Sequence, residues 1–148
     1  MTTIANYLFP GNTRFGFGAV DLVGQEAARQ GAHHAFILTD PGVAAAGLIE
    51  PVVAALSAAG IAHTVNTHCP SNPDAGSIDA AAAVFRDMRA DLVIGLGGGS
   101  PIDGAKAIRA LVGGPPGASI IEYALLLRDR ARPIPHVRDM PPMIAIPT

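Results

Sequence analysis

The residues with the clearest chemical potential are a run of glycines behind a short apolar segment. Residues 92–106 read LVIGLGGGSPIDGAK, so three consecutive glycines, 97–99, separate a predicted strand from a predicted helix. Glycine lacks a Cβ atom and lets a ligand approach the backbone closely. The first amides of a helix have no intrahelical partner and carry partial positive charge. Together these features predict an anion site for the pyrophosphate of a nucleotide cofactor.

The residues after the glycines predict how the helix begins. Ser100 suits the N-cap position, and Pro101 suits the first helical position, where a missing N–H costs nothing. Asp103 follows Ser100 by three residues, as in a capping box, and Lys106 is spaced to pair with Asp103. Alternatively, these residues only start the helix and take no part in binding.

Two better-known phosphate-binding motifs do not fit. A P-loop ends in Gly-Lys-Ser/Thr, whereas Lys106 stands between two alanines. The dinucleotide fingerprint G-x-G-x-x-G follows the first strand of its unit, whereas residues 95–100 end in serine and come late in the chain. The glycine run therefore predicts a different kind of phosphate cradle.

Composition narrows the class of protein. The 148 residues suffice for one compact domain, 1–148, and 49% hydrophobic with 15% charged residues suggests that one face is buried against another domain or subunit. A net charge of −2 favours neither nucleic acid nor an anionic membrane as partner, and no apolar run is long enough to span a bilayer. The N-terminus lacks the features of a secretory signal, and the single Cys69 suits a reducing compartment, so we expect a cytoplasmic protein.

Apolar runs alternate with helical spacing along the chain. The expected elements are a hairpin with strands at 7–10 and 14–17, strands at 35–38, 62–65, 92–94 and 143–146, helices at 20–30, 44–59, 77–89 and 102–111, and a helical stretch at 120–127. Pro51 either interrupts its helix or marks the first turn of a second part, and Ser77 is the expected cap of the next helix. This alternation predicts an α/β, Rossmann-like fold. Its mostly parallel sheet has helices on both faces, and a short N-terminal β-hairpin precedes it.

In such sheets ligands bind at the carboxyl ends of the strands. Three features fall on that edge: Asp40, the loop at 71–73 and the glycine turn at 97–100. Their common location supports a single cofactor site.

Residues 97–106 resemble the GGGSxxDxAK signature of the iron-containing (group III) alcohol dehydrogenases. Supporting segments follow in the family's order. They are FGFGA at 15–19, LTDPG at 38–42, PSNP at 70–73, which has one residue more than the family's Pro-Asn-Pro loop, and IAIPT at 144–148. The resemblance covers nearly the whole chain.

The resemblance implies a two-domain oxidoreductase. The family's N-terminal half binds NAD or NADP, and its helical C-terminal half holds the catalytic metal with an Asp and three His. The chain resembles the nucleotide-binding half. We therefore expect Fe²⁺ or Zn²⁺ only in the C-terminal domain that it lacks, no catalytic or metal-binding residue in residues 1–148, and no activity of the chain alone.

By position, the resemblance assigns the glycines and Ser100 to the pyrophosphate and Thr148 to the neighbourhood of the adenine. Asp40 would accept hydrogen bonds from the adenosine ribose and repel a 2′-phosphate, which favours NAD over NADP; otherwise it is only a turn residue. Asn72 either joins the site or only folds its loop through an Asx turn. The expected cofactor-binding residues are Asp40, Asn72, Gly97, Gly98, Gly99, Ser100, Asp103 and Thr148.

The implied reaction is hydride transfer between a small alcohol or aldehyde and nicotinamide, with the metal as Lewis acid. The substrate would bind in the cleft between the domains of what we expect to be a homo-oligomer. One alternative is a non-catalytic nucleotide-binding module. Another is a relative such as a glycerol dehydrogenase, a maleylacetate reductase or a dehydroquinate synthase.

A metal site within the chain is a weaker alternative. His63, His68 and Cys69 are close in sequence, and His33 and His34 are adjacent. A structural zinc site needs four ligands at suitable spacing, which this set does not offer. We expect His33 and His34 to form a solvated approach to the strand at 35–38.

Overall fold

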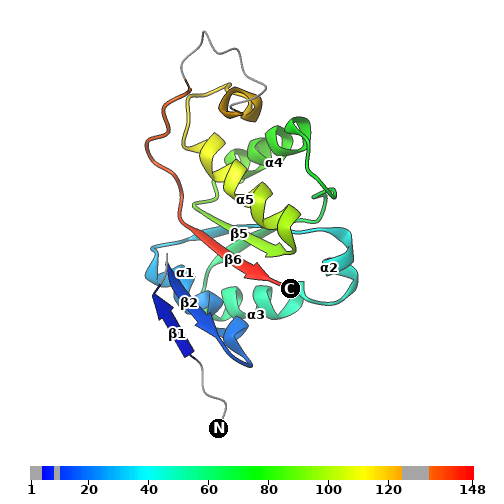
Figure 1. The fold of residues 1–148 in the computed structure, drawn as a ribbon. Coiled ribbons are helices and arrows are strands. Elements are labelled where there is room, and N and C mark those ends of the chain that lie inside the picture. The colour runs from blue at the N-terminus through cyan, green and yellow to red at the C-terminus, as the bar shows by residue number, and fades with distance from the viewer. Residues whose placement is uncertain (1–4, 9–10, 125–133) are drawn as a thin grey trace.

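A four-stranded parallel sheet forms the centre of the computed structural model, which describes residues 5–8, 11–124 and 134–148 (Figure 1). The strand order is β4-β3-β5-β6. The strands are β3 (His34–Leu38), β4 (Ala62–Asn66), β5 (Leu92–Gly97) and β6 (Met143–Pro147). All neighbouring pairs are parallel, so the carboxyl ends share one edge of the sheet. The predicted α/β fold with a parallel sheet is confirmed.

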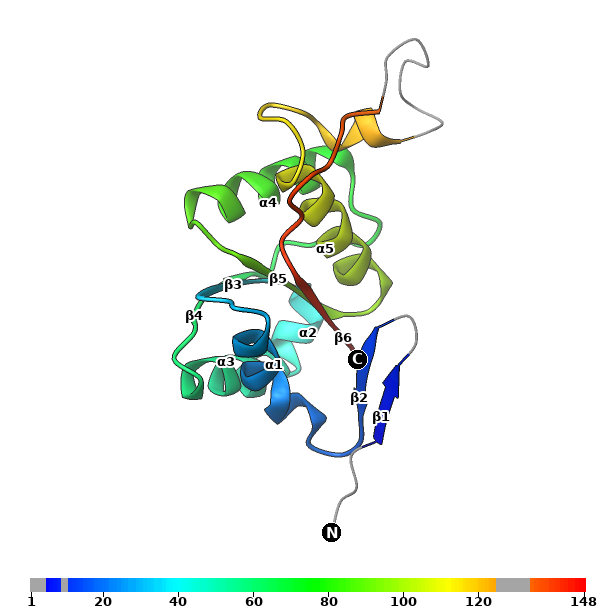
Figure 2. The same ribbon diagram turned by 90° about the vertical axis from the view of Figure 1, so that its left-hand side faces the viewer.

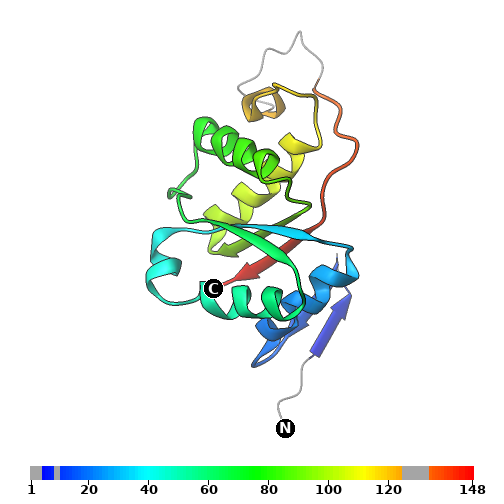
Figure 3. The ribbon, with the colours of Figure 1, turned by 180° about the vertical axis from the view of Figure 1, so that it is seen from behind.

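Helices cover both faces of this sheet (Figure 3). The helices are α1 (Val23–Arg29) and α3 (Ile49–Ala58) on one face, and α4 (Ala75–Asp87) and α5 (Gly99–Val112) on the other. In β3, Ala35 and Ile37 pack with α1 and α3, whereas Phe36 and Leu38 pack with α4 and α5. A strand buried on both faces is apolar at every position, which explains the continuous apolar run at 35–38.

A separate antiparallel hairpin precedes the sheet, with strands β1 (Ala5–Leu8) and β2 (Asn12–Phe15) (Figure 2). The hairpin was predicted, but each strand begins two residues earlier than expected, because Asn12 and Thr13 belong to β2 instead of the turn. Arg14 of β2 forms an ion pair of 2.7 Å with Glu26 of α1. This contact joins the hairpin to the first helix.

The expected helix at 44–59 is two helices. They are α2 (Pro41–Ala45) and α3, and between them lies Gly47, which has a φ of 71°. That left-handed conformation suits glycine and ends the helix. Pro51 lies in the first turn of α3, where proline is tolerated. The expectation that Pro51 marks the first turn of a second helical part is therefore correct.

The start of α4 also differs from the prediction. Its N-cap is Asp74, whose Oδ1 accepts a 2.7 Å hydrogen bond from the Ser77 N–H, so Ser77 lies within the first turn. Serine and aspartate are both good caps, and local sequence alone does not decide between them. The assignment of Ser77 as the cap was therefore wrong.

Two short 3₁₀ helices complete the described structure. They are η1 (Ala19–Leu22) and η2 (Ile120–Tyr123). The segment expected to be helical at 120–127 is thus 3₁₀ in its first half, while residues 125–127 lie outside the described residues. Among the helices that are described, none is long and apolar enough to cross a membrane.

Candidate functional site

The carboxyl edge of the sheet carries a hollow of about 590 Å³. Three connections meet there: the turn after β3, the loop after β4 and the glycine turn after β5 (Figure 1). The residues that line it are Asp40, Pro41, Gly42, His68, Cys69, Pro70, Ser71, Gly98, Gly99, Ser100 and Pro101. The sheet edge thus brings the predicted features into one cavity of a size that suits a small-molecule ligand.

The glycine turn exposes its backbone to this hollow. A Cβ atom placed on Gly98 or on Gly99 would meet no heavy atom within 4 Å, and both residues are exposed. Gly97 lies behind them, buried, with a φ of 135° that only glycine adopts readily. Gly97 lets the chain turn, and Gly98 and Gly99 leave room for a ligand.

Helix α5 begins earlier than predicted. Gly98 is its N-cap and Gly99 its first residue, so Ser100 and Pro101 lie in the first turn, and the expected capping box of Ser100 and Asp103 was wrong. The backbone turns at Gly97 and is helical from Gly99 onward, which leaves Ser100 inside the helix. No side chain caps this terminus. Its first amides therefore keep hydrogen-bonding capacity for an anion.

Close packing brings α5 against the sheet. A Cβ atom on Gly95 of β5 would lie 3.0 Å from the Ile102 Cα atom and 3.1 Å from the Pro101 carbonyl oxygen. Gly95 therefore allows the first turn of α5 to lie directly on the strand that leads into it. This packing fixes the direction in which the amides of the glycine turn point.

Asp40 has two roles in the structure. Its Oδ1 accepts a 2.9 Å hydrogen bond from the Val43 N–H and caps α2. Its Oδ2 lies 3.2 Å from the position that a Cβ atom on Gly97 would take. The carboxylate thus stands beside the glycine turn at the wall of the hollow. Asp40 is thus the N-cap of a helix that the sequence did not predict, and it also lines the hollow.

Ser100, which lines the hollow, is hydrogen-bonded to Asn72, which does not. The Asn72 N–H donates a hydrogen bond of 3.3 Å to the Ser100 Oγ. Asn72 has a φ of 56°, in the left-handed region. The loop after β4 is thereby held against the first turn of α5.

The remaining two predicted residues, Thr148 and Asp103, do not line the hollow. Thr148 donates its N–H to the Gly97 carbonyl at 3.3 Å, which holds the end of β6 beside the glycine turn. Asp103 is exposed on α5, pairs with Lys106 at 2.8 Å as expected, and does not line the hollow. A cofactor role for Asp103 stays a prediction.

Cys69 is a lining residue that the sequence analysis did not assign to the cofactor site. Its side chain is buried and lines the hollow. Burial first, and the negative charge of Asp40 second, raise the pKa of the Cys69 thiol. The thiol is therefore protonated at neutral pH and is a poor nucleophile. Its position directly before the PSNP segment is the signal that would have identified it.

Comparison with known proteins identifies the family of the chain. The family described as iron-containing alcohol dehydrogenase matches residues 10–148. The chain belongs to this family. The relatives of the chain in the family include a probable alcohol dehydrogenase, EutG, of Salmonella typhimurium, 33% identical over 147 residues, which are 98% of this chain and 34% of that protein. Lactaldehyde reductase of Escherichia coli is 32% identical over 134 residues, 90% of this chain and 33% of the reductase.

Solved structures of alcohol dehydrogenases and related enzymes share the fold. A 1,3-propanediol oxidoreductase superposes with a TM-score of 0.79 at 25% identity, over 100% of this chain and 36% of its own. Sulfoacetaldehyde reductase from Bifidobacterium kashiwanohense, solved in complex with NAD⁺, gives a TM-score of 0.74 at 26% identity, over 88% and 32% of the two chains. The chain spans about a third of the length of the relatives that it matches.

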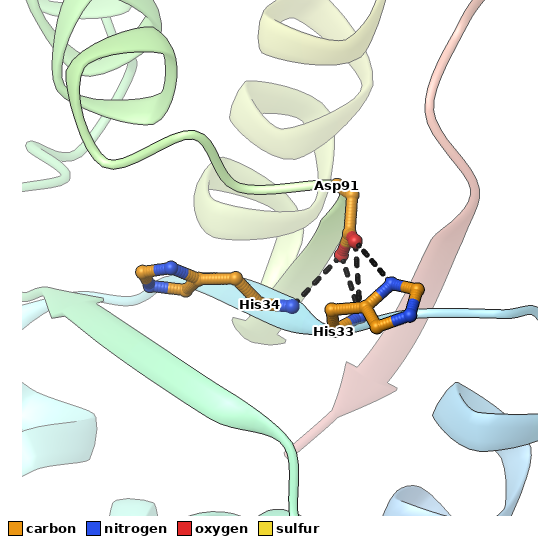
Figure 4. Close-up of polar contacts among 3 residues, drawn as sticks. All are labelled: His33, His34 and Asp91. Carbon is orange, nitrogen blue, oxygen red and sulfur yellow. Dashed lines mark hydrogen bonds and ion pairs between the residues drawn. The ribbon is translucent and has the colours of Figure 1, made fainter.

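Histidines at the other end of the sheet have a structural role (Figure 4). The Asp91 carboxylate accepts hydrogen bonds from the N–H groups of His33 and His34 at 2.9–3.0 Å, and its Oδ2 lies 3.1 Å from His33 Nδ1. His34 Nε2 lies 2.9 Å from the Thr64 hydroxyl. Across 5–8, 11–124 and 134–148, no three His, Cys, Asp or Glu side chains are grouped to hold a metal. His34 is the first residue of β3 and His33 directly precedes it, so Asp91 holds the chain where this strand begins.

We expect the Asp91→Asn variant to be less stable at neutral pH by about 1–2 kcal/mol. Charged hydrogen bonds contribute about 1.5–3 kcal/mol, reduced here because the Asp91 side chain is 40% exposed. Partial burial raises the pKa of Asp91, but hydrogen bonds from His34 and His33 outweigh it and leave this pKa below its ordinary value.

The lowered pKa determines how the stability depends on pH. The contribution of Asp91 is complete above the ordinary pKa of an aspartate and is lost as the pH falls through the lower, folded-state pKa. Urea unfolding between pH 7 and pH 3 would measure this. If the wild type and the Asp91→Asn variant differ equally at every pH, Asp91 does not act through its charge.

Proposed function

We propose that this chain binds NAD(H) at the glycine turn, as the nucleotide-binding part of an iron-containing alcohol dehydrogenase. The observation that carries the proposal is the combination of an uncapped N-terminus of α5 with open space at Gly98 and Gly99. A diphosphate would accept hydrogen bonds from these amides and from the Ser100 hydroxyl and gain from the helix dipole. The family and the NAD⁺ complex of sulfoacetaldehyde reductase support this choice of cofactor.

The residues of this chain would bind and orient the cofactor. Asp40 would accept from the adenosine ribose, and Thr148, beside Gly97, would lie near the adenine. The whole protein would transfer hydride between a small alcohol or aldehyde and nicotinamide in a cleft shared with a second domain. A metal bound outside the described residues would act as a Lewis acid on the substrate oxygen.

Titration of the chain with NADH and with ADP-ribose tests the proposal. Because the proposed contacts involve the pyrophosphate and the adenosine ribose, both ligands should bind, with a Kd between about 1 µM and 1 mM, the range that is common for enzyme KM values. Adenosine alone should bind much more weakly. Equal binding of adenosine and ADP-ribose would show that the diphosphate is not recognised.

Replacement of Asp40 by glycine should shift cofactor preference toward NADP. A carboxylate beside the ribose repels a 2′-phosphate, so its removal should raise the NADPH-to-NADH affinity ratio by about 10-fold or more, or about 1.4 kcal/mol. Glycine is an acceptable N-cap, so the Asp40→Gly substitution should lower the free energy of unfolding by only a few tenths of a kcal/mol. The Asp40→Asn variant, which keeps the cap, is the matched control for the charge. An unchanged ratio in both variants would limit Asp40 to capping.

A further inference from the structure

The contact between Asn72 and Ser100 links two connections of the sheet. Ser100 belongs to the first turn of α5, and Asn72 belongs to the loop between β4 and α4, 28 residues earlier. The donor is the backbone N–H of Asn72, not its amide side chain. The side chain of Asn72 is exposed, and the hydrogen bonds found among the described residues include none from it. Any effect of Asn72 on Ser100 is therefore transmitted by the backbone.

The backbone of Asn72 is in an uncommon conformation. Among the described residues other than glycine, only Asn72, with a φ of 56°, and Arg89, with a φ of 52°, lie in the left-handed region. Arg89 follows the C-cap of α4, where helices commonly end in this way. Asn72 ends no helix; it lies in the loop that borders the hollow. Left-handed backbone is costly for most residues and least so for glycine and asparagine.

The hydrogen bond from the Asn72 N–H determines which part of the Ser100 hydroxyl is free to bind a ligand. A hydroxyl has one hydrogen to donate and two lone pairs to accept with. The Asn72 N–H uses a lone pair, so the hydrogen remains available for the hollow that Ser100 lines together with Gly98 and Gly99. A hydroxyl that accepts a hydrogen bond is also a better donor. The amide of Asn72 thus both fixes the hydroxyl and strengthens it as a donor.

We infer that Asn72 is a positioning residue for diphosphate binding, and that it acts through its left-handed backbone. In this conformation its N–H holds the Ser100 oxygen, and the Ser100 hydrogen points to the oxygen of a bound diphosphate. The inference rests on the proposed function and adds a residue that acts without touching the ligand. Ser100 is the group in contact with the diphosphate.

The test compares Asn72→Gly with Asn72→Ala in the wild type and in a Ser100→Ala background, with Kd values for NADH and ADP-ribose as the readout. Glycine keeps both the N–H and the left-handed conformation, so its Kd should stay within about twofold of wild type. Alanine keeps the N–H but disfavours the conformation, so binding should weaken about fivefold, or about 1 kcal/mol. In the Ser100→Ala background, glycine and alanine at position 72 should bind equally, because no hydroxyl is left to position.

The variants Arg89→Gly and Arg89→Ala are the matched control. They make the same comparison at the other left-handed residue, at the end of α4, and should alter the unfolding midpoint without altering either Kd. Equal weakening in Asn72→Gly and Asn72→Ala would assign the effect to the asparagine side chain and overturn the inference. Unchanged binding in Asn72→Ala, or a difference that persists without Ser100, would overturn it as well. Failure of the wild-type chain to bind either ligand would instead refute the proposed function, and this inference with it.

Discussion

The Gly98→Val variant should bind NADH at least about 100-fold more weakly than the wild type. The valine side chain would occupy the open space in front of the first amides of α5, where no heavy atom lies within 4 Å of a Cβ position. Loss of two charged hydrogen bonds, at about 1.5–3 kcal/mol each, accounts for an effect of this size. The same open space means that the side chain meets nothing in the folded protein. The free energy of unfolding should therefore change by no more than about 1 kcal/mol, the usual effect of a surface substitution or a lost cap.

The Gly11→Val variant provides the control for this substitution. Gly11 is also exposed, also has an open Cβ position, and lies before β2; it is not among the residues that line the hollow. Its NADH affinity should equal that of the wild type. Calorimetric titration gives the affinities, and thermal unfolding gives the stabilities. Wild-type affinity in Gly98→Val would remove the glycine turn from the cofactor site.

The Gly24→Ala variant should lose stability, with an effect of about 2–3 kcal/mol. Gly24 lies at the crossing of α1 and α3, where a Cβ atom would clash with the Ala55 carbonyl oxygen and lie 2.9 Å from the Ala59 Cβ atom. Alanine favours a helix over glycine by about 1 kcal/mol, but a backbone clash in a packed interface commonly costs more. The two helices must therefore move apart, and the core on this face of the sheet loosens.

The Gly76→Ala variant is the matched control for Gly24→Ala. Gly76 is likewise near the start of a helix, but the nearest atom to its Cβ position is the Asp74 Oδ1 at 3.6 Å. The Gly76→Ala variant should keep or slightly raise the melting temperature, whereas the Gly24→Ala variant should lower the melting temperature by about 5–10 °C. A melting temperature for Gly24→Ala at or above that of the wild type would show that α1 and α3 can separate at no cost.

The order and type of the main elements could be predicted from the sequence because the central strands are buried on both faces. Runs such as 35–38 and 92–94 are apolar at every position, and each is followed by a turn or a glycine. The strand β5 continues to Gly97, beyond the predicted end at Ile94. Glycine is a poor strand former, and here pairing with β6 overrides that preference, because Gly95 and Gly97 lie opposite Ala145 and Pro147.

Helix starts were harder to predict for a physical reason. A side-chain cap has a sequence signature, and Ser77 and Ser100 both carry it. The true N-caps are Asp74, three residues earlier, and Gly98, which has no capping side chain at all. Gly98 takes the N-cap position because the backbone turns at Gly97. A short sequence pattern does not show where such a turn occurs.

Contacts between distant segments account for the part of the site that was missed. Glycines 97–99 and Ser100 could be proposed because they are consecutive, and Asp40 because it follows a strand. The bond between Asn72 and Ser100 and the burial of Cys69 depend on how the loop after β4 folds over α5. Spacing within one segment carries no information on such packing.

Backbone amide chemical shifts, recorded while ADP-ribose is added to the ¹⁵N-labelled chain, test the central claim most directly. If the amides at the start of α5 bind the diphosphate, the largest changes should occur at Gly98, Gly99 and Ser100, with smaller ones at Asp40. The amides of His33 and His34, at the opposite end of the sheet, should stay unchanged. Large shifts confined to residues outside the hollow, with the glycine turn unaffected, would contradict the claim.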